Sequence, residues 1–100
     1  MSFRIRVAGR ASAQIRRAAE WWLANRTKAS SAFAEEIERG FELIRMIPGA
    51  GERVVHPRLP ELRRLLLGRV RYHLYYVVSK EDEAIEILAL WHTSRKPPRI

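Results

Sequence analysis

The sequence predicts an α+β domain in which a helical hairpin packs on a small antiparallel sheet. Three observations predict this fold class: an alternating apolar and polar segment at residues 3–7, two segments with apolar residues at helical spacing, and three strand-like segments within residues 61–92. The predicted order of elements is β-α-α-β-β-β. A chain of 100 residues is close to the usual size of one domain, and we assign residues 1–100 to a single domain.

The first strand and the first helix follow from two different periodicities. Phe3 to Val7 alternates between apolar and polar side chains, as expected for a half-buried strand at a sheet edge. Residues 10–25 are predicted to form a helix that ends at Asn25, because apolar residues recur on one helical face. That face carries Ala11, Ile15, Ala18, Ala19, Trp22 and Leu23. Trp21 lies beside this stripe, since adjacent helix positions cannot face the same core.

The second helix is predicted from a stripe of larger apolar residues. The stripe consists of Phe33, Ile37, Phe41, Ile44 and Ile47. Glutamate and arginine residues fill the opposite face. The segment Pro48-Gly49-Ala50-Gly51 is expected to end the helix and to begin a loop over residues 48–60. Because only a few residues separate the helices, they are expected to form an antiparallel hairpin.

The remaining strands are predicted from apolar and aromatic runs in the last third of the chain. They span residues 61–67, 70–79 and 84–92. Short turns join them, which makes consecutive strands antiparallel neighbours. The last strand is apolar on both faces and is therefore predicted to be central. In the middle strand, Arg71, His73 and Tyr75 are expected to share the face turned away from the helices, which no helix remains to cover.

The composition is strongly basic and contains no cysteine. Lysine and arginine total 19 against 11 aspartate and glutamate residues, for a net charge of +8. Only Lys28, Lys80 and Lys96 are lysines, and arginine suits phosphate and carboxylate recognition through its planar fork. This charge fits nucleic acid or an acidic protein partner, while its simplest role is solubility. Without cysteine there is no disulfide, no cysteine-based metal site and no cysteine nucleophile.

Two further expectations concern ligands and location. His56, His73 and His92 lack the spacing of metal ligands, so we expect no metal and no cofactor. We expect no signal peptide, and the sequence shows no run near the roughly 20 apolar residues that a membrane helix needs. We therefore expect a soluble protein of the cytoplasm that does not associate with a membrane.

With these elements in place, the chain resembles the RelE/ParE superfamily of toxins from bacterial type II toxin–antitoxin modules. The resemblance covers nearly the whole chain. It is carried by Ala18-Ala19-Glu20-Trp21-Trp22 with Asn25-Arg26, by Phe33 and Ile37, by Pro48-Gly49-Ala50-Gly51, by Leu62-Arg63-Arg64, and by the runs from Tyr72 to Val78 and from Ile87 to Arg95. It implies a RelE/ParE-like toxin fold. It also implies a small toxin that inhibits growth and belongs to a module of the kind that stabilises plasmids. A cognate antitoxin, encoded beside the toxin, would neutralise it.

The superfamily contains two activities, and the resemblance favours one of them. RelE-like members are ribosome-dependent endoribonucleases that cut mRNA, whereas ParE-like members poison DNA gyrase and are not known to cleave anything. The Trp-Trp-x-x-Asn-Arg helix and the Trp-His-x-x-Arg ending are more similar to ParE-like members. We therefore favour a gyrase inhibitor that is not an enzyme. The alternatives are an mRNA endoribonuclease and an inactive relative that only binds its antitoxin.

RNA cleavage of the RelE type would need a base, stabilising cations and an acid. Under this alternative the resemblance implies Arg64 and His92 as catalytic residues, and Arg71 is the remaining candidate for a basic group. The set is incomplete, because Thr93 stands where some relatives carry a tyrosine and no lysine lies in the expected strands. Arginine is also a poor base, since it stays protonated. A histidine at a strand end is more often structural, which is the simpler interpretation of His92.

The residues expected to bind the target are basic side chains of the last third. They are Arg63, Arg64, Arg71, His92 and Arg95. Under the gyrase hypothesis, Arg95 and the basic tail that follows it would contribute to inhibition. The simpler interpretation of the strand arginines is a solvated face with cross-strand partners such as Glu61 and Glu86.

The residues expected to bind the antitoxin lie near the start of the chain. In the superfamily the antitoxin packs a helix against the helical hairpin and often adds a strand to the sheet edge. In this sequence those contacts would fall on Phe3, Ile5 and Val7 at the edge and on Trp21 at the hairpin. The basic surface would suit an acidic partner, and we expect a toxin–antitoxin hetero-oligomer.

Overall fold

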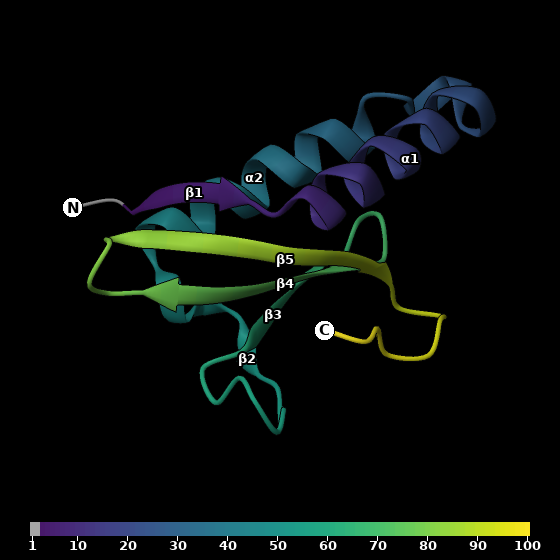
Figure 1. The fold of residues 1–100 in the computed structure, drawn as a ribbon. Coiled ribbons are helices and arrows are strands. Elements are labelled where there is room, and N and C mark those ends of the chain that lie inside the picture. The colour runs from purple at the N-terminus through teal and green to yellow at the C-terminus, as the bar shows by residue number, and fades with distance from the viewer. Residues whose placement is uncertain (1–2) are drawn as a thin grey trace.

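In a computed structural model, which describes residues 3–100, two helices cover one face of a five-stranded sheet (Figure 1). The elements are β1 (Arg4–Val7), α1 (Gly9–Asn25), a short 3₁₀ turn η1 (Thr27–Ala29), α2 (Ala32–Met46), a second 3₁₀ turn η2 (Pro48–Ala50), β2 (Glu52–Arg53), β3 (Arg63–Leu67), β4 (Tyr72–Ser79) and β5 (Ala84–His92). The predicted α+β class and the predicted order of elements are confirmed. The sequence did not predict the two-residue strand β2 or the two 3₁₀ turns.

The sheet is mixed rather than antiparallel, which corrects one part of the predicted architecture. Its strand order is β1-β5-β4-β3-β2. Strand β1 runs parallel to β5, and all other neighbours are antiparallel. Short turns force antiparallel pairing between β3, β4 and β5, but no turn joins β1 to its neighbour, so nothing local sets its direction. The edge position of β1 and the central position of β5 are confirmed.

The turn between β3 and β4 corrects the predicted position of Arg71. Strand β4 begins at Tyr72 rather than at residue 70. Arg71 adopts a left-handed backbone conformation with φ of 66°, and its N–H donates to the carbonyl of Leu67 at 2.8 Å. This conformation is uncommon for a residue other than glycine and belongs to a tight turn. Arg71 therefore lies at the sheet end and not on the strand face with His73 and Tyr75.

A β-bulge explains why β5 is apolar on both faces. Tyr75 pairs with Ala89 and Tyr76 pairs with Ile87, which leaves Leu88 as an extra residue on β5. The bulge shifts the alternation, so Ile87 and Leu90 both belong to the cluster under the helices. Ala89 belongs to a smaller cluster on the other face.

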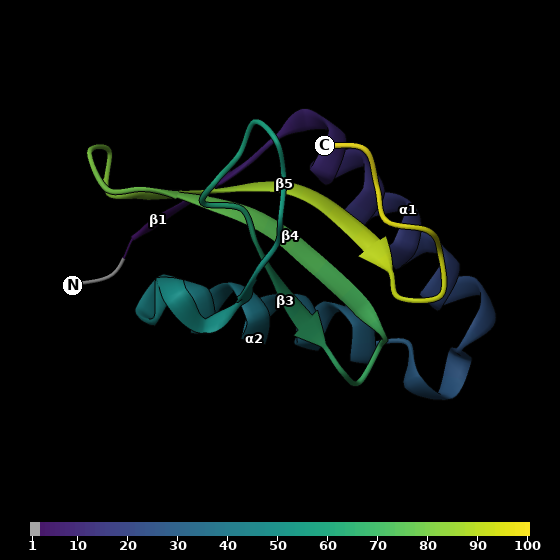
Figure 2. The same cartoon turned by 90° about the horizontal axis from the view of Figure 1, so that it is seen from below.

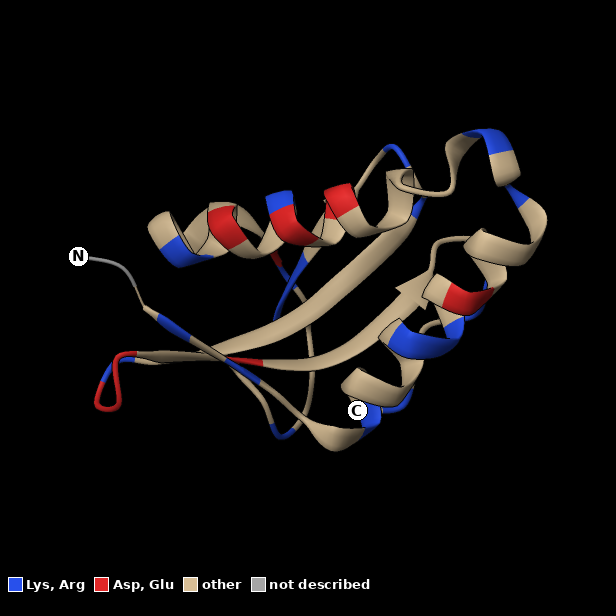
Figure 3. Ribbon diagram, turned by 90° about the horizontal axis from the view of Figure 1, so that it is seen from above, with Lys and Arg blue, Asp and Glu red and all other residues tan. Residues whose placement is uncertain are grey.

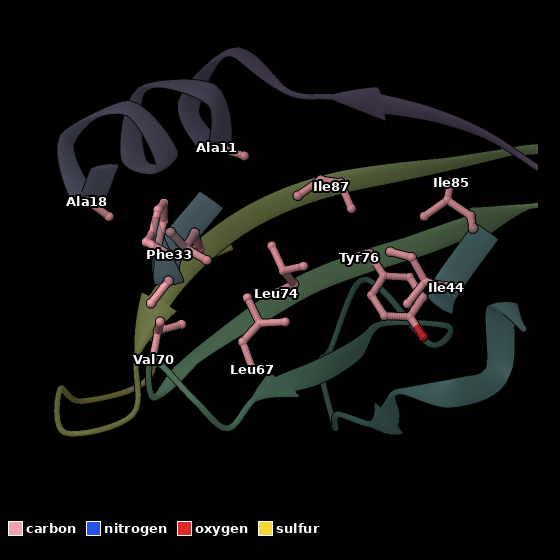
Figure 4. Packing of buried hydrophobic residues seen from close by; sticks show 12 residues of the cluster. Ala11, Ala18, Phe33, Ile44, Leu67, Val70, Leu74, Tyr76, Ile85 and Ile87 are labelled. Carbon is pink, nitrogen blue, oxygen red and sulfur yellow. The ribbon is translucent and has the colours of Figure 1, made fainter. Parts of the chain in front are cut away.

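The main core lies between the helices and the sheet (Figure 4). It is built from aliphatic and aromatic side chains of both helices and of strands β3, β4 and β5. They include Ala11, Ala18, Phe33, Ile44, Leu67, Leu74, Tyr76, Ile85, Ile87 and Leu90. Gly40 lets α2 approach the sheet closely, because a Cβ atom there would lie 2.7 Å from Cδ2 of Leu67. The predicted apolar stripe of the second helix thus faces the sheet from Phe33 to Ile44, whereas Ile47 follows the end of the helix and is 57% exposed.

The outer face of the sheet, opposite the helices, is partly covered by the segment before β3 and by the end of the chain (Figure 2). Leu62, Tyr75 and Ala89 are buried there. The ring of His56 joins the two covering segments: its Nδ1 accepts N–H groups of Arg58 and Leu59 at 3.0 and 3.1 Å, and its Nε2 lies 2.7 Å from the oxygen of Ile100. Since Nδ1 accepts, Nε2 carries the hydrogen and donates.

Between residues 3 and 100, no helix is long and apolar enough to cross a bilayer.

Candidate functional site

A pocket of about 530 Å³ lies between the C-terminal part of α1, the turn before β4 and the end of β5. Arginine is the only residue type with a permanent charge in its lining. We call it the arginine pocket. Its lining consists of Trp21, Trp22, Arg26, Arg69, Val70, Arg71, Tyr72, His92, Ser94 and Arg95. A concave site of this size that contains cations and no carboxylate is suited to an anionic ligand.

A row of aromatic rings connects this pocket to the core. The rings of Phe33 and Tyr72 meet edge to face with centroids 5.6 Å apart, and those of Tyr72 and His92 do so at 5.0 Å. Tyr72 and His92 are also directly paired across β4 and β5. Burial raises the pKa of Tyr72, which keeps its hydroxyl protonated at neutral pH. The core thereby holds the ring of His92 at the pocket wall.

His92 presents a hydrogen-bond donor to its surroundings rather than a base. The backbone N–H of Ser94 donates to Nδ1 of His92 at 3.1 Å, and the Ser94 hydroxyl oxygen lies 2.7 Å from the same atom. A backbone N–H can only donate, so Nδ1 is an acceptor and Nε2 carries the ring hydrogen. In this tautomer the remaining nitrogen can donate to an oxygen of an anion.

Three arginines of the pocket lack a carboxylate partner. The guanidinium of Arg26 lies 5.6 Å from the ring centroid of Trp21, and that of Arg95 lies 3.9 Å from the ring centroid of Trp91. Arg69 differs, since it forms an ion pair with Glu35 at 2.8 Å. Within the described part of the chain, no ion pair involves Arg26, Arg71 or Arg95. Their charge is therefore available to a ligand.

Arg63 and Arg64 serve a different part of the molecule. Arg63 Nη1 donates to the carbonyl of Gly51 at 2.7 Å. Arg64 Nε donates to Glu52 Oε1 at 2.6 Å, and its Nη1 lies 3.4 Å from the Tyr75 hydroxyl. The hydrogen bonds with Tyr75 and Glu52 raise the pKa of Arg64 further. Both arginines thus hold the segment before β3 against the sheet.

The structure also separates the residues of the RNA-cleavage hypothesis. Arg64 pairs with Tyr75 and belongs to the outer face, while His92 pairs with Tyr72 and belongs to the helix side. Arg71 and His92 both line the arginine pocket, together with Arg95, and Arg64 does not. Two of the three residues are therefore brought together, and the third lies across the sheet.

Comparison with known protein families decides to which family the chain belongs. A family model described as the ParE toxin of the type II toxin–antitoxin system, parDE, matches residues 5–97. The chain belongs to the ParE toxin family. Among curated protein sequences, no significant match to this ParE-family chain is found.

Three solved structures share the fold of this ParE-family chain. The toxin–antitoxin complex RelBE2 from Mycobacterium tuberculosis matches with 19% identity and a TM-score of 0.67, over 92% of this chain and 99% of that chain. The chromosomal ParDE system from P. aeruginosa matches with 14% identity and a TM-score of 0.69, over 91% and 96% of the two chains. The archaeal RelE–RelB complex from Pyrococcus horikoshii OT3 matches with 19% identity and a TM-score of 0.52, over 96% and 100%. At these identities the likeness is one of fold.

The ParE-family chain leaves one backbone edge of its sheet unpaired. Strand β1 is the first strand in the sheet order and has β5 as its only neighbour in the described chain. The N–H groups of Arg4 and Ala8 donate to carbonyls on the β5 side. By alternation, the N–H and C=O groups of Ile5 and Val7 point away from the sheet. The side chains of Phe3 and Ile5 pack against the core, whereas Val7 is 39% exposed.

Sequence reasoning missed several residues of the pocket in this ParE-family chain. Trp22 continues the core stripe, and Arg26 was part of a family motif without an assigned role. The available signal was the helical spacing, because Arg26 follows Trp22 by four positions and so lies next to it on the helix. Tyr72 and Arg69 gave no such signal, since their proximity to α1 depends on how the hairpin docks.

Between residues 3 and 100, no group of three metal-binding side chains is present.

His73 predicts a measurable pH dependence of stability. Burial, with a smaller contribution from Arg64, lowers the pKa of His73 below its ordinary 6.5, although Glu52 opposes this. As the pH falls from about 6.5 toward this lowered pKa, the unfolded chain binds more protons than the folded chain, so stability is lost over that range. When the pH is lowered from about 7.5 to about 5.5, we expect the free energy of unfolding to fall less for His73→Gln than for the unmodified chain, as measured by urea denaturation. Equal losses in the two proteins would contradict this assignment.

Proposed function

We propose that this ParE-family chain is a toxin that inhibits DNA gyrase and is neutralised by a cognate antitoxin. The observation that carries the proposal is the match of the ParE toxin family over residues 5–97. ParE-like members of the superfamily poison gyrase, according to the resemblance described above. The RelBE2 complex and the ParDE system, which share the fold, are toxin–antitoxin assemblies, and this supports an antitoxin partner for the present chain.

The arrangement of the basic residues supports target binding over RNA cleavage. Arg71, His92 and Arg95 line one exposed pocket, and Arg64 lies on the other face of the sheet. A binding surface needs cations in reach of a partner, whereas a cleavage site needs a base, an acid and cations around one phosphate. His92 presents a donor in its observed hydrogen bonding. The pocket therefore fits recognition of a target better than acid–base chemistry.

The free edge of β1 and a neighbouring groove suit an antitoxin. The groove, of about 680 Å³, lies between β1 and α2 and has Ile5 and Phe41 in its lining, with charged residues from Glu35 to Arg45 around them. An added strand would use the outward N–H and C=O groups of Ile5 and Val7. A net charge of +8 favours an acidic partner. Trp21 remains a proposed contact at the hairpin.

The proposal predicts a selective loss of toxicity when two pocket arginines are neutralised. The variant Arg71→Asn/Arg95→Gln is expected to inhibit gyrase supercoiling and to stabilise gyrase cleavage complexes at least about tenfold less than the unmodified chain, since two unpaired cations are lost. Asparagine tolerates the left-handed backbone at position 71. Arg10→Gln/Arg16→Gln removes the same charge from exposed positions outside the pocket lining and serves as the matched control.

The same experiment separates the alternatives. Gyrase cleavage complexes and an SOS response without mRNA cuts support the gyrase target. Codon-positioned mRNA cuts that His92→Ala abolishes would overturn it. Absence of growth inhibition, of gyrase inhibition and of mRNA cuts would identify a relative that only binds its antitoxin.

A second candidate function, mRNA cleavage, is favoured by one observation on the outer face. There His73 lies beside Arg64, with a pKa lowered by burial, so its ring is neutral at physiological pH. A neutral imidazole near a guanidinium can serve as a base beside a phosphate-binding cation. If the chain cuts mRNA, we expect His73→Gln and Arg64→Gln each to reduce the cuts by about 100-fold. Cuts that survive both substitutions would exclude this face.

A further inference from the structure

We propose that the arginine pocket binds single-stranded nucleic acid, with phosphates on its arginines and a base stacked on Trp21. The site goes beyond gyrase inhibition and does not depend on it, because it is defined by the pocket's own side chains. Its test needs only the purified chain and an oligonucleotide.

Charge of one sign runs continuously through two adjoining pockets. A side pocket of about 230 Å³ adjoins the arginine pocket, and the two share Trp21, Tyr72, His92 and Arg95 in their linings. The side pocket adds Arg17, and neither lining contains a carboxylate. Figure 3 shows that basic residues predominate on α1, whereas acidic and basic residues mix along α2. The joined pockets thus form a track of cations beside α1, as a backbone of successive phosphates requires.

An exposed aromatic surface lies within this track. Trp21 is 47% exposed, although Trp22 already supplies the core contact at this end of α1. The two indole rings meet edge to face with centroids 6.0 Å apart. Arg26 lies over the ring of Trp21 at 5.6 Å from its centroid, and the exposed part of the ring offers a stacking surface for a base. Cations that alternate with aromatic rings are the usual composition of single-strand binding surfaces.

The combination of cations and an exposed ring favours nucleic acid over an acidic peptide. Carboxylates could neutralise the arginines, but a carboxylate side chain offers no flat apolar surface to the ring of Trp21. A single strand satisfies both features, because each nucleotide carries one phosphate and one stacking base. A duplex keeps its bases stacked on each other and offers none to Trp21. The hydrogen on Nε2 of His92 adds a donor for a phosphate or sugar oxygen.

The closing experiment measures binding of a fluorescently labelled oligothymidylate of about 12 nucleotides by anisotropy at several salt concentrations. Arg71→Asn/Arg95→Gln is expected to weaken binding roughly tenfold or more. The dependence of log affinity on log salt should become shallower by about 1.4, since each lost phosphate contact contributes about 0.7 for a single strand. The control Arg10→Gln/Arg16→Gln has the same net charge and should bind within about threefold of the unmodified chain. Equal weakening by the two pairs would overturn the site, because binding would then follow net charge alone.

A separate variant tests the stacking of a base on Trp21. Trp21→Leu keeps all cations and is expected to weaken oligothymidylate binding about tenfold, while binding of a glutamate-only peptide stays unchanged. Circular dichroism and urea denaturation check that each variant folds. Tighter binding of the glutamate peptide than of the oligonucleotide would assign the pocket to an acidic protein and overturn the proposal. Tighter binding of a duplex of the same length would overturn it as well.

Discussion

Replacement of Phe33 by alanine is expected to lower the free energy of unfolding by about 3–5 kcal/mol. Phe33 is 2% exposed, lies near the start of α2 and belongs to the main core. Its ring meets Tyr72 at 5.6 Å, and Tyr72 meets His92 at 5.0 Å. The cavity left by the ring would therefore loosen both the hairpin and the wall of the arginine pocket. Urea denaturation followed by far-ultraviolet circular dichroism measures the change.

Two control variants test whether the loss of stability is specific to the buried ring of Phe33. Leu23→Ala removes an apolar side chain that is 63% exposed on α1, and it should change the free energy of unfolding by about 0.5 kcal/mol or less. Phe33→Leu retains most of the buried volume and should fall between the two. A loss below about 1 kcal/mol for Phe33→Ala would show that the docking of α2 does not depend on this ring.

Gly51→Ala is expected to lower the free energy of unfolding by about 3 kcal/mol. A Cβ atom at position 51 would lie 2.7 Å from the Tyr76 hydroxyl and 2.8 Å from the carbonyl oxygen of Arg64. The second neighbour is backbone of β3 and cannot rotate away. The Tyr76 hydroxyl donates to the carbonyl of Pro48 at 2.7 Å and accepts the N–H of Gly51 at 2.8 Å. The added methyl group would therefore strain the loop and break a buried hydrogen bond.

The neighbouring glycine gives a matched control for this substitution. A Cβ atom at Gly49 would meet no atom within 4 Å, and its backbone φ is not positive. Gly49→Ala should therefore be neutral or stabilise by up to about 1 kcal/mol through the unfolded state. Tyr76→Phe removes one of the two clashes, so Gly51→Ala should cost less in that background. Equal effects of Gly49→Ala and Gly51→Ala in thermal denaturation would contradict the close packing.

The helices and the antiparallel part of the sheet could be predicted because their signals are local. The stripe from Phe33 to Ile44 repeats within one helix, and the turns between β3, β4 and β5 are too short for any other pairing. Three features could not be predicted in this way: the direction of β1, the bulge at Leu88 and the left-handed conformation of Arg71. Each depends on how segments distant in sequence pack together.

The same distinction holds for the site. The sequence indicated basic residues near the end of the chain and an edge strand at its start, and both are present. It grouped Arg64 with Arg71 and His92, which the structure places on different sides of the sheet. Alternation along β4 puts Tyr72 and Tyr75 on opposite faces of the sheet, and these two residues pair with His92 and Arg64. The start of β4 was predicted two residues too early, which assigned Arg71 to the strand face of Tyr75 instead of to the turn.

By itself, the sequence determined the α+β class, the order of the elements and the resemblance to a toxin superfamily, because periodicity, short turns and ordered motifs are local properties. Only the tertiary structure decided that Trp21, Arg26, Arg71 and Arg95 surround one pocket, while Arg63 and Arg64 hold a loop. The reason is physical. Docking of the hairpin brings the end of α1 to the turn before β4, and burial of the apolar faces determines this docking. The position of the charged side chains follows from that packing.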